Sequence, residues 1–330
     1  MNSILKLILA KKKTVLFGQR KSRNFAFTLV DILISIFFFL FLIPFFLTLL
    51  QQTGNYLIKL IDYRAAYNRA FSVVSLLRYP IFYCGLGVPT DVDGYKQSFG
   101  NSRFQPFNWT GPVSVVKNPL GLENAELRIV FAKCDYKKLK SNFKYKEQGK
   151  VISFTKKIDK NTIVASNSGA PNNIKNCIVF RSSFPNANPL VVRWVSSDRY
   201  FLEVESYLND EYFQLYKNDK MYLLSALKVF CKNAILYTND YKISGDQPRV
   251  DGIQDIRFYL DNNKNFITIY ILSRGKFQYN DYKKIIGIEK CFPELESEWS
   301  VIKSTYQLYV YKTVWRLPNC LSENLLFAKD

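Results

Sequence analysis

A nearly continuous apolar stretch close to the start of the chain constrains the fold more than any other feature. It runs from Ile32 to Leu50 and is broken only by Ser35, Pro44 and Thr48. A helix rises about 1.5 Å per residue, so a helix of this length spans the hydrocarbon core of a bilayer, which is about 30 Å thick. The stretch ends in two glutamines rather than in a small-residue cleavage site. This ending favours a retained membrane anchor over a cleaved secretory signal.

The charges before this stretch predict its orientation. Residues 1–26 contain seven Lys and Arg residues and no Asp or Glu. Cytoplasmic flanks of membrane helices are enriched in positive charge, so residues 1–26 are expected to stay in the cytoplasm and the residues after Leu50 to be translocated. No second apolar stretch of comparable length follows. We therefore expect a chain that crosses the membrane once, with its bulk on the extracytoplasmic side.

One charged residue marks the junction between the basic segment and the apolar stretch. Asp31 is the only charge between Arg23 and Lys59. An ionised side chain at the edge of a membrane helix is costly and is usually paired. The spacing therefore marks Asp31 as a candidate for pairing with a positive group.

The same junction, RNFAFTLVD at residues 23–31, resembles the signal of type IV pilin-like proteins, in which Phe-Thr-Leu-x-acid follows a small residue. The resemblance implies cleavage by a prepilin peptidase between Ala26 and Phe27, methylation of the new N-terminus, and pairing of Asp31 with the N-terminal amine of a neighbouring subunit. The usual pattern has Gly before the cut and Glu at the fifth mature position, so this chain departs from it at both places. An ordinary signal anchor is the alternative.

The helical pattern continues beyond the apolar stretch. Pro80 predicts that the helix ends near Tyr79, and Gly54 predicts a flexible point between its membrane half and its soluble half. Apolar residues at intervals of three and four predict a seam that packs against the rest of the chain: Leu60, Tyr63, Tyr67, Ala70, Val74, Leu77 and Ile81.

The remainder of the chain is rich in β-branched and aromatic residues and predicts strands. The expected strands are 126–134, 176–181, 190–196, 200–206, 221–230, 254–261, 265–273 and 304–315, with loops at 94–119 and 166–173. Together with the helix they predict an α+β fold, a long N-terminal helix packed on an elaborated antiparallel sheet, as in pilin-like proteins. The expected division is a cleaved basic leader (1–26), a transmembrane or filament-core helix (27–50), an amphipathic half (51–80) and a β-rich head (81–330).

A late segment, VDGIQDIRFY at residues 250–259, resembles a strand of the PilW group of large minor pilins and of the J-type minor pseudopilins of type II secretion. This resemblance implies a non-enzymatic assembly component that primes or caps a type IV pilus or a type II secretion pseudopilus. Its implied partners are prepilin peptidase, other minor and major pilins or pseudopilins, and the inner-membrane assembly platform. Before assembly the protein would cross the inner membrane once, with its head in the periplasm or at the cell exterior. After assembly it would lie in the filament or at its tip.

The composition limits the chemistry of the chain. It contains no histidine, which excludes Ser-His-Asp and Cys-His nucleophile pairs and metal sites that contain histidine. We expect no enzyme activity, no cofactor and no metal. A membrane-anchored enzyme that uses carboxylates in the middle of the chain is an alternative, but nothing in the sequence nominates its residues.

The six cysteines all follow the apolar stretch, and none forms a CxxC pair. An even number of cysteines in an extracytoplasmic segment favours disulfides, whose pairing the sequence leaves open. Six buried thiols in strands are the alternative. The residues concerned are Cys84, Cys134, Cys177, Cys231, Cys291 and Cys320.

A lysine-rich segment suggests a second function. The chain has a net charge of +19, and residues 133–160 contain ten lysines against three acidic residues. Lysines interleaved with Tyr136, Phe143 and Tyr145 have the composition of a groove that binds phosphates and stacks bases. A pilin-anchored DNA-binding or adhesive module is therefore the alternative function, although a solvated surface explains the segment more simply because it contains no arginine. The candidate anion-binding residues are Lys137, Lys138, Lys140, Lys144 and Lys146.

Overall fold

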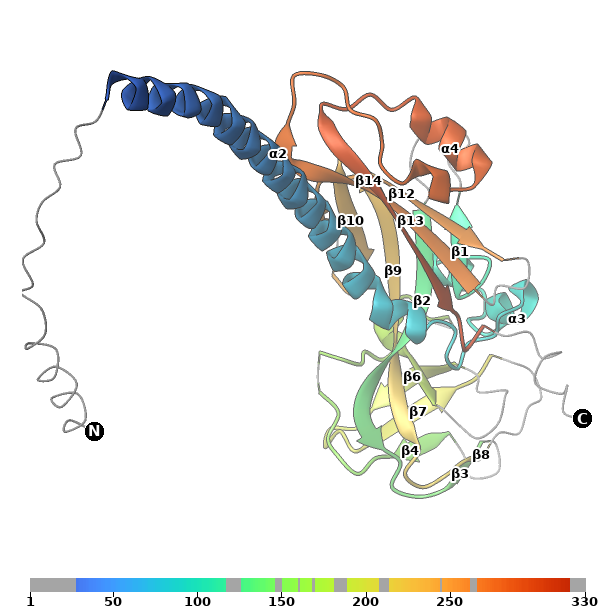
Figure 1. Cartoon of the computed structure of the whole chain (residues 1–330). Helices are drawn as coiled ribbons and strands as arrows, with labels where there is room; N and C mark the ends of the chain where they lie inside the picture. Colours follow the sequence, from blue (N-terminus) through green and yellow to red (C-terminus); the bar gives the residue numbers. More distant parts are fainter. Residues whose placement is uncertain are drawn as a thin grey trace, which may run out of the picture. The chain divides into compact units, whose positions relative to one another are not determined.

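The computed structural model describes residues 28–116, 126–145, 150–159, 161–167, 170–180, 189–207, 214–243, 245–261 and 266–320. The chain divides into two compact units at the boundary between Leu57 and Ile58. The first unit contains the start of the long N-terminal helix, and the second, here called the C-terminal unit, contains the end of that helix and all described strands (Figure 1).

The long N-terminal helix is present as predicted. Helix α2 spans Leu29–Phe82, and its most apolar window of 18 residues has a mean hydropathy of 2.8. Among the described residues it is the one helix long and apolar enough to cross a membrane. It runs without a break through Gly54, close to the boundary between the two units.

The predicted end of this helix near Tyr79 is wrong. The helix passes through Pro80 and ends at Phe82, and the N–H of Tyr83 then donates to the carbonyl of Tyr79. A proline lacks one N–H donor, but here the residue is buried, and burial of its apolar ring offsets part of that loss.

The larger sheet is antiparallel and has nine strands in the described part of the chain. Its main order is β1-β2-β9-β5-β6-β7-β4, and β10 pairs with both β9 and β11. The strand bounds are β1 Val113–Val116, β2 Glu126–Lys138, β4 Val151–Ser153, β5 Cys177–Phe180, β6 Leu190–Val195, β7 Phe201–Glu205, β9 Lys220–Lys232, β10 Ile235–Asp240 and β11 Asp246–Asp251.

A second antiparallel sheet has the order β12-β13-β14. Its described strands are β12 Ile253–Leu260, β13 Phe266–Gln278 and β14 Tyr306–Arg316. A short pair joins β3 (Phe143–Lys144) to β8 (Gln214–Leu215). The short helices are α3 Val92–Gln97 and α4 Pro293–Ser300, with single 3-10 turns at Gln105–Asn108, Ile174–Asn176 and Ile288–Lys290.

All eight predicted strands occur, and β2, β9 and β13 are longer than expected. The α+β class is therefore confirmed. The loop expected at 94–119 is wrong in part, because it includes most of α3, a 3-10 turn and β1. The Asp91 side chain caps α3 by accepting a hydrogen bond from the N–H of Gly94 at 2.6 Å, and Tyr95 and Phe99 bury their rings.

The end of helix α2 packs into the main core. Ala70, Val73, Leu77 and Ile81 share one cluster of buried side chains with residues of β2, β9, β12 and β13. The start of the predicted seam is only partly covered, because Leu60, Tyr63 and Tyr67 remain 40–47% exposed. The rings of Tyr63 and Tyr67 nevertheless contact the ring of Tyr311 in β14. The buried residues of the helix are Asp62, Ala66, Ala70, Val73, Leu77, Pro80 and Ile81.

Candidate functional site

The candidate site is helix α2, whose two halves have different surroundings. The apolar half is Leu29–Leu57, and the anchoring half is Ile58–Phe82. Large apolar side chains of the apolar half are exposed, from 47% for Leu42 to 76% for Leu29. A helix that is apolar on all sides is stable when lipid or other helices cover it. This half therefore requires an apolar environment outside its own unit.

The start of the helix forms a capping box. The backbone N–H of Thr28 donates to the Asp31 carboxylate at 3.1 Å, and the backbone N–H of Asp31 donates to Thr28 Oγ1 at 3.3 Å. The Thr28 hydroxyl also donates to the same carboxylate at 2.7 Å. These bonds satisfy backbone donors that the first helical turn leaves open.

This role of Asp31 within its own chain was not predicted, although Thr-x-x-Asp before an apolar run is a pattern that indicates it. Ala26 and Phe27, the predicted cleavage residues, lie outside the described residues. Of the predicted pair between Asp31 and an N-terminal amine, the structure therefore describes Asp31. Its carboxylate accepts hydrogen bonds from Thr28 of the same chain.

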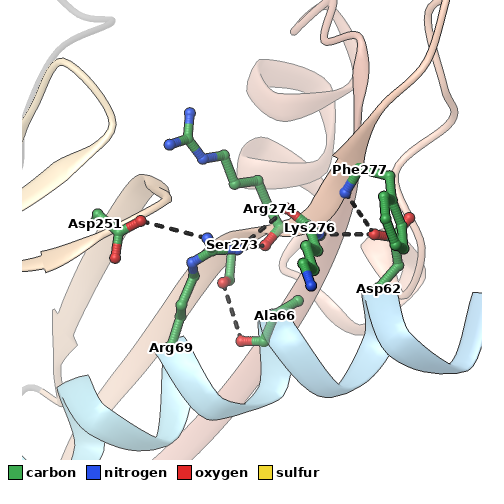
Figure 2. Close-up of polar contacts among 9 residues, drawn as sticks. Asp62, Ala66, Arg69, Asp251, Ser273, Arg274, Lys276 and Phe277 are labelled. Atoms are coloured by element: carbon green, nitrogen blue, oxygen red, sulfur yellow. Dashed lines mark hydrogen bonds and ion pairs between the residues drawn. The ribbon is translucent and has the colours of Figure 1, made fainter.

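The anchoring half is attached to β13 through a buried carboxylate. Asp62 is fully buried, and its Oδ1 accepts hydrogen bonds from the backbone N–H groups of Lys276 and Phe277 at 2.7 and 2.8 Å. Its Oδ2 accepts a hydrogen bond from the hydroxyl of Tyr279 at 2.5 Å. Figure 2 shows the carboxylate directed from the helix toward this strand.

These partners lie where β13 is irregular. The pairing of β13 with β14 changes register between Arg274 and Gln278. A bulge leaves backbone groups without ladder partners, and such groups are costly when buried. Asp62 therefore supplies acceptors for donors that the neighbouring strand does not pair.

A second polar residue of the helix, Arg69, donates hydrogen bonds to backbone carbonyls of the same segment of β13. Arg69 Nη1 donates to the carbonyl oxygens of Arg274 and Gly275 at 2.8 and 3.1 Å, and its Nη2 lies 3.3 Å from Asp251 (Figure 2). One turn away, the hydroxyl of Ser273 donates to the carbonyl of Ala66 at 3.0 Å. Donors and acceptors of the strand are thus both satisfied by the helix.

Two glycines make this close approach feasible. A Cβ at Gly275 would lie 2.7 Å from Cγ of Asp62, and a Cβ at Gly252 would lie 2.6 Å from Nε of Arg69. Gly252 also has φ of +71°, a conformation that favours glycine. The glycine of the late segment that resembles minor pilins therefore has a packing role beside the helix.

The environment of Tyr279 keeps its phenol protonated. Burial, the hydrogen bond to Asp62 and the negative charge of Asp62 raise the pKa of Tyr279 to about 12. The hydroxyl is therefore a donor to the carboxylate across the physiological range.

The lysines of the candidate anion-binding patch differ in burial. Lys137 is only 5% exposed, and its Nζ lies 2.5 Å from Asp135 and 3.6 Å from Asp159. It is thus neutralised inside the protein. Lys138, Lys140 and Lys144 are exposed, and Lys146 lies outside the described residues.

Two of the aromatic residues expected to stack on bases, Phe143 and Tyr145, are buried. Phe143 and Tyr145 belong to a buried apolar cluster, and the hydroxyl of Tyr145 accepts a hydrogen bond from the backbone N–H of Ser206 at 3.1 Å. These two rings stabilise the fold and are not available as a stacking platform. This arrangement weakens the case for the nucleic-acid alternative.

The structure holds all six cysteines as thiols. Cys84, Cys177, Cys231 and Cys320 are buried, whereas Cys134 and Cys291 are half-buried. The Sγ atoms of Cys84 and Cys320 lie 3.8 Å apart. Disulfide formation stays a prediction, and this pair is its strongest candidate.

Comparison with known proteins returns no match to the chain among protein-family models, curated proteins or solved structures. Only the residues and geometry described above therefore bear on its function.

Proposed function

We propose that this chain is a minor pilin or pseudopilin, a non-enzymatic and membrane-anchored subunit that primes or caps a type IV pilus or a type II secretion pseudopilus. The observation that carries the proposal is the division of helix α2. Its apolar half exposes large hydrophobic side chains throughout, whereas its anchoring half is packed in the core of the C-terminal unit. Such a helix joins a soluble unit to an apolar environment.

Two environments satisfy the apolar half in this proposal. A bilayer covers it before assembly, and the helices of other subunits cover it afterwards. Both surroundings are apolar, so the transfer between them exposes little hydrophobic surface to water. Prepilin peptidase, other pilins or pseudopilins and the inner-membrane assembly platform are the partners that this transfer requires.

The size of the C-terminal unit favours a low copy number. Residues 58–330 form one compact unit. A unit of this bulk, repeated at every position of a narrow rod, would crowd its neighbours. A place at the tip, where a priming complex forms, avoids this crowding.

Asp31 has two functions in this proposal. It caps the helix within its own chain and pairs with the N-terminal amine of an adjacent subunit after cleavage. An unpaired carboxylate in the hydrocarbon region costs about 2.5 to 3.5 kcal/mol on insertion scales, so pairing biases assembly toward one register.

The N-terminus of the mature protein tests the processing step. Intact-mass analysis and N-terminal sequencing of the membrane-extracted protein are expected to identify an N-methylated Phe27. An N-terminus at Met1, or one after Leu50, would contradict the proposal.

A set of variants tests the pairing step and separates it from helix capping. We expect Asp31→Ala to be cleaved and inserted but to lose co-purification with its partners and filament initiation, whereas Asp31→Glu retains both. Thr28→Ala is the matched control, because it removes the capping hydroxyl but keeps the carboxylate. It should retain co-assembly. Equal losses in Thr28→Ala and Asp31→Ala would show that capping, rather than pairing, is the role of Asp31.

A further inference from the structure

Two cysteines that are distant in sequence meet where the long helix ends. Cys84 follows the last residue of α2 by two positions, and Cys320 follows the last residue of β14 by four. They are separated by 236 residues in the chain, yet their Sγ atoms lie 3.8 Å apart. Both side chains are buried, with exposures of 0% and 3%.

The backbone around both cysteines is held in place. The side-chain amide of Asn319 donates to the carbonyl of Phe82 at 3.1 Å, and Leu317 is fully buried in the main core. On the other side, the N–H of Gly85 donates to the carbonyl of Val130 in β2 at 3.2 Å. The two sulfurs therefore meet between segments that other contacts already position.

Gly85 leaves the space that the sulfur of Cys320 occupies. It has φ of +72°, and a Cβ at this position would lie 2.8 Å from Sγ of Cys320. Glycine is required here both by the backbone conformation and by the close approach of the sulfur.

We infer that Cys84 and Cys320 form a disulfide that ties the C-terminal segment to the end of helix α2. A disulfide has an S–S length of about 2.05 Å, so the two sulfurs must approach each other by less than about 2 Å. This inference goes beyond the proposed function and depends on it only for the oxidising compartment in which the bond forms.

The chemistry is thiol–disulfide exchange with a small-molecule or protein disulfide as the oxidant. One cysteine thiolate attacks a sulfur of the oxidant and releases one thiol. The other cysteine thiolate then attacks the mixed disulfide and releases the second thiol. The two cysteines lose two protons and two electrons, and the oxidant is reduced to two thiols.

The bond is expected to form before the two segments pack and to persist once they have packed. Burial, with a smaller effect from the neighbouring Cys320, raises the pKa of Cys84 well above its ordinary value. A buried thiol with a raised pKa supplies little thiolate for exchange. The same burial protects the finished bond from external reductants.

Peptide mapping of the full chain tests the inference. Protein extracted from membranes in detergent is alkylated with iodoacetamide and digested with trypsin without reductant. Cleavage at Lys and Arg places Cys84 in peptide 79–96 and Cys320 in peptide 317–329, each with one cysteine. A second sample is reduced in denaturant and refolded with glutathione disulfide before the same digestion.

We expect a linked 79–96/317–329 peptide in both samples. It should disappear after reduction with dithiothreitol and should form normally in Cys177→Ala, which removes another buried thiol. Reduction of the native protein is expected to be at least about tenfold slower than in denaturant. Separate alkylation of both peptides in the refolded sample, or a link from either peptide to another cysteine, would overturn the inference. A link that forms with glutathione but not in cells would support it and would contradict the extracytoplasmic placement of the proposed function.

Discussion

The two halves of helix α2 relate hydrophobicity to burial in opposite ways. The apolar half consists mostly of large hydrophobic residues, yet their side chains are exposed along its length. The anchoring half buries a carboxylate completely at Asp62, while Tyr63 and Tyr67 remain nearly half exposed. Side-chain hydrophobicity alone therefore does not decide which face of this helix is covered.

The difference follows from what each half meets. The anchoring half meets a strand with unpaired backbone groups, so the acceptors of Asp62 and the donors of Arg69 are worth more there than additional apolar area. Small residues at Ala66, Ala70 and Gly275 let the helix and strand approach closely. The described side chains of the apolar half are exposed, which suits them to lipid or to other helices.

Among the substitutions in helix α2, replacement of Asp62 is expected to have the largest effect on the stability of the C-terminal unit. Asp62→Ala leaves two part-buried N–H groups and a phenol without their acceptor. We expect the loss of three hydrogen bonds to a charged group to lower the free energy of unfolding of the C-terminal unit by about 3 to 5 kcal/mol. All four tryptophans lie in this unit. Denaturation of the detergent-solubilised full chain, followed by tryptophan fluorescence, therefore reports on it selectively.

The control for this substitution is Asp281→Ala, at an exposed carboxylate. It should change the free energy of unfolding by less than about 0.5 kcal/mol. Equal stability of Asp62→Ala and wild type would show that the carboxylate does not hold the helix to β13.

A matched pair of leucines sharpens the comparison between the two halves. Leu77 is fully buried in the main core, whereas Leu47 is 60% exposed. We expect Leu77→Ala to create a cavity and to cost about 2 to 4 kcal/mol in the same measurement. Leu47→Ala should leave the stability of the C-terminal unit unchanged. A similar loss from both substitutions would indicate that the halves form one cooperative unit.

The smallest expected effect is on the pH dependence of the free energy of unfolding, through the hydrogen bond from Tyr279 to Asp62 of the anchoring half. Because the pKa of Tyr279 is raised to about 12, its phenol ionises first in the unfolded chain as the pH rises above about 10. The hydrogen bond from Tyr279 to Asp62 therefore stabilises the folded chain fully below pH 10, and this stabilisation is lost as the pH approaches 12. Tyr279→Phe should cost about 1 kcal/mol at neutral pH and should weaken this decline, measured by denaturation between about pH 9 and pH 12. Tyr282→Phe, at an exposed phenol, should retain the wild-type decline.

The sequence was sufficient to predict the elements that hydrophobic patterns mark. Strong runs such as those in β2, β9 and β13 appear as strands, because β-branched and aromatic residues favour half-buried extended chains.

The hairpin from β9 to β10 was not predicted, and the reason lies in the residues of its turn. Its two-residue turn, Asn233 and Ala234, has φ of 51° and 57°. Such turns usually carry glycine, so alanine hides the signal.

The anchoring site was missed because its key residue is charged. The apolar periodicity of the helix includes Tyr63 and leaves Asp62 out, whereas the structure buries Asp62 completely and leaves Tyr63 47% exposed. The reversal depends on the bulge in β13, which lies more than 200 residues away in sequence. No local pattern reports such a distant partner.

The location of the Asp62 carboxylate has a consequence for how the protein bears tension. In the filament that we propose, force would enter this chain along the axis of helix α2. The contacts of Asp62 and Arg69 pass that force to β13, the middle strand of its sheet, which is hydrogen-bonded to β12 on one side and β14 on the other. The helix lies along this strand, since Asp62 contacts Lys276 and Ala66 contacts Ser273. The bonds between them are therefore loaded in shear and resist together, whereas bonds that peel would fail one after another.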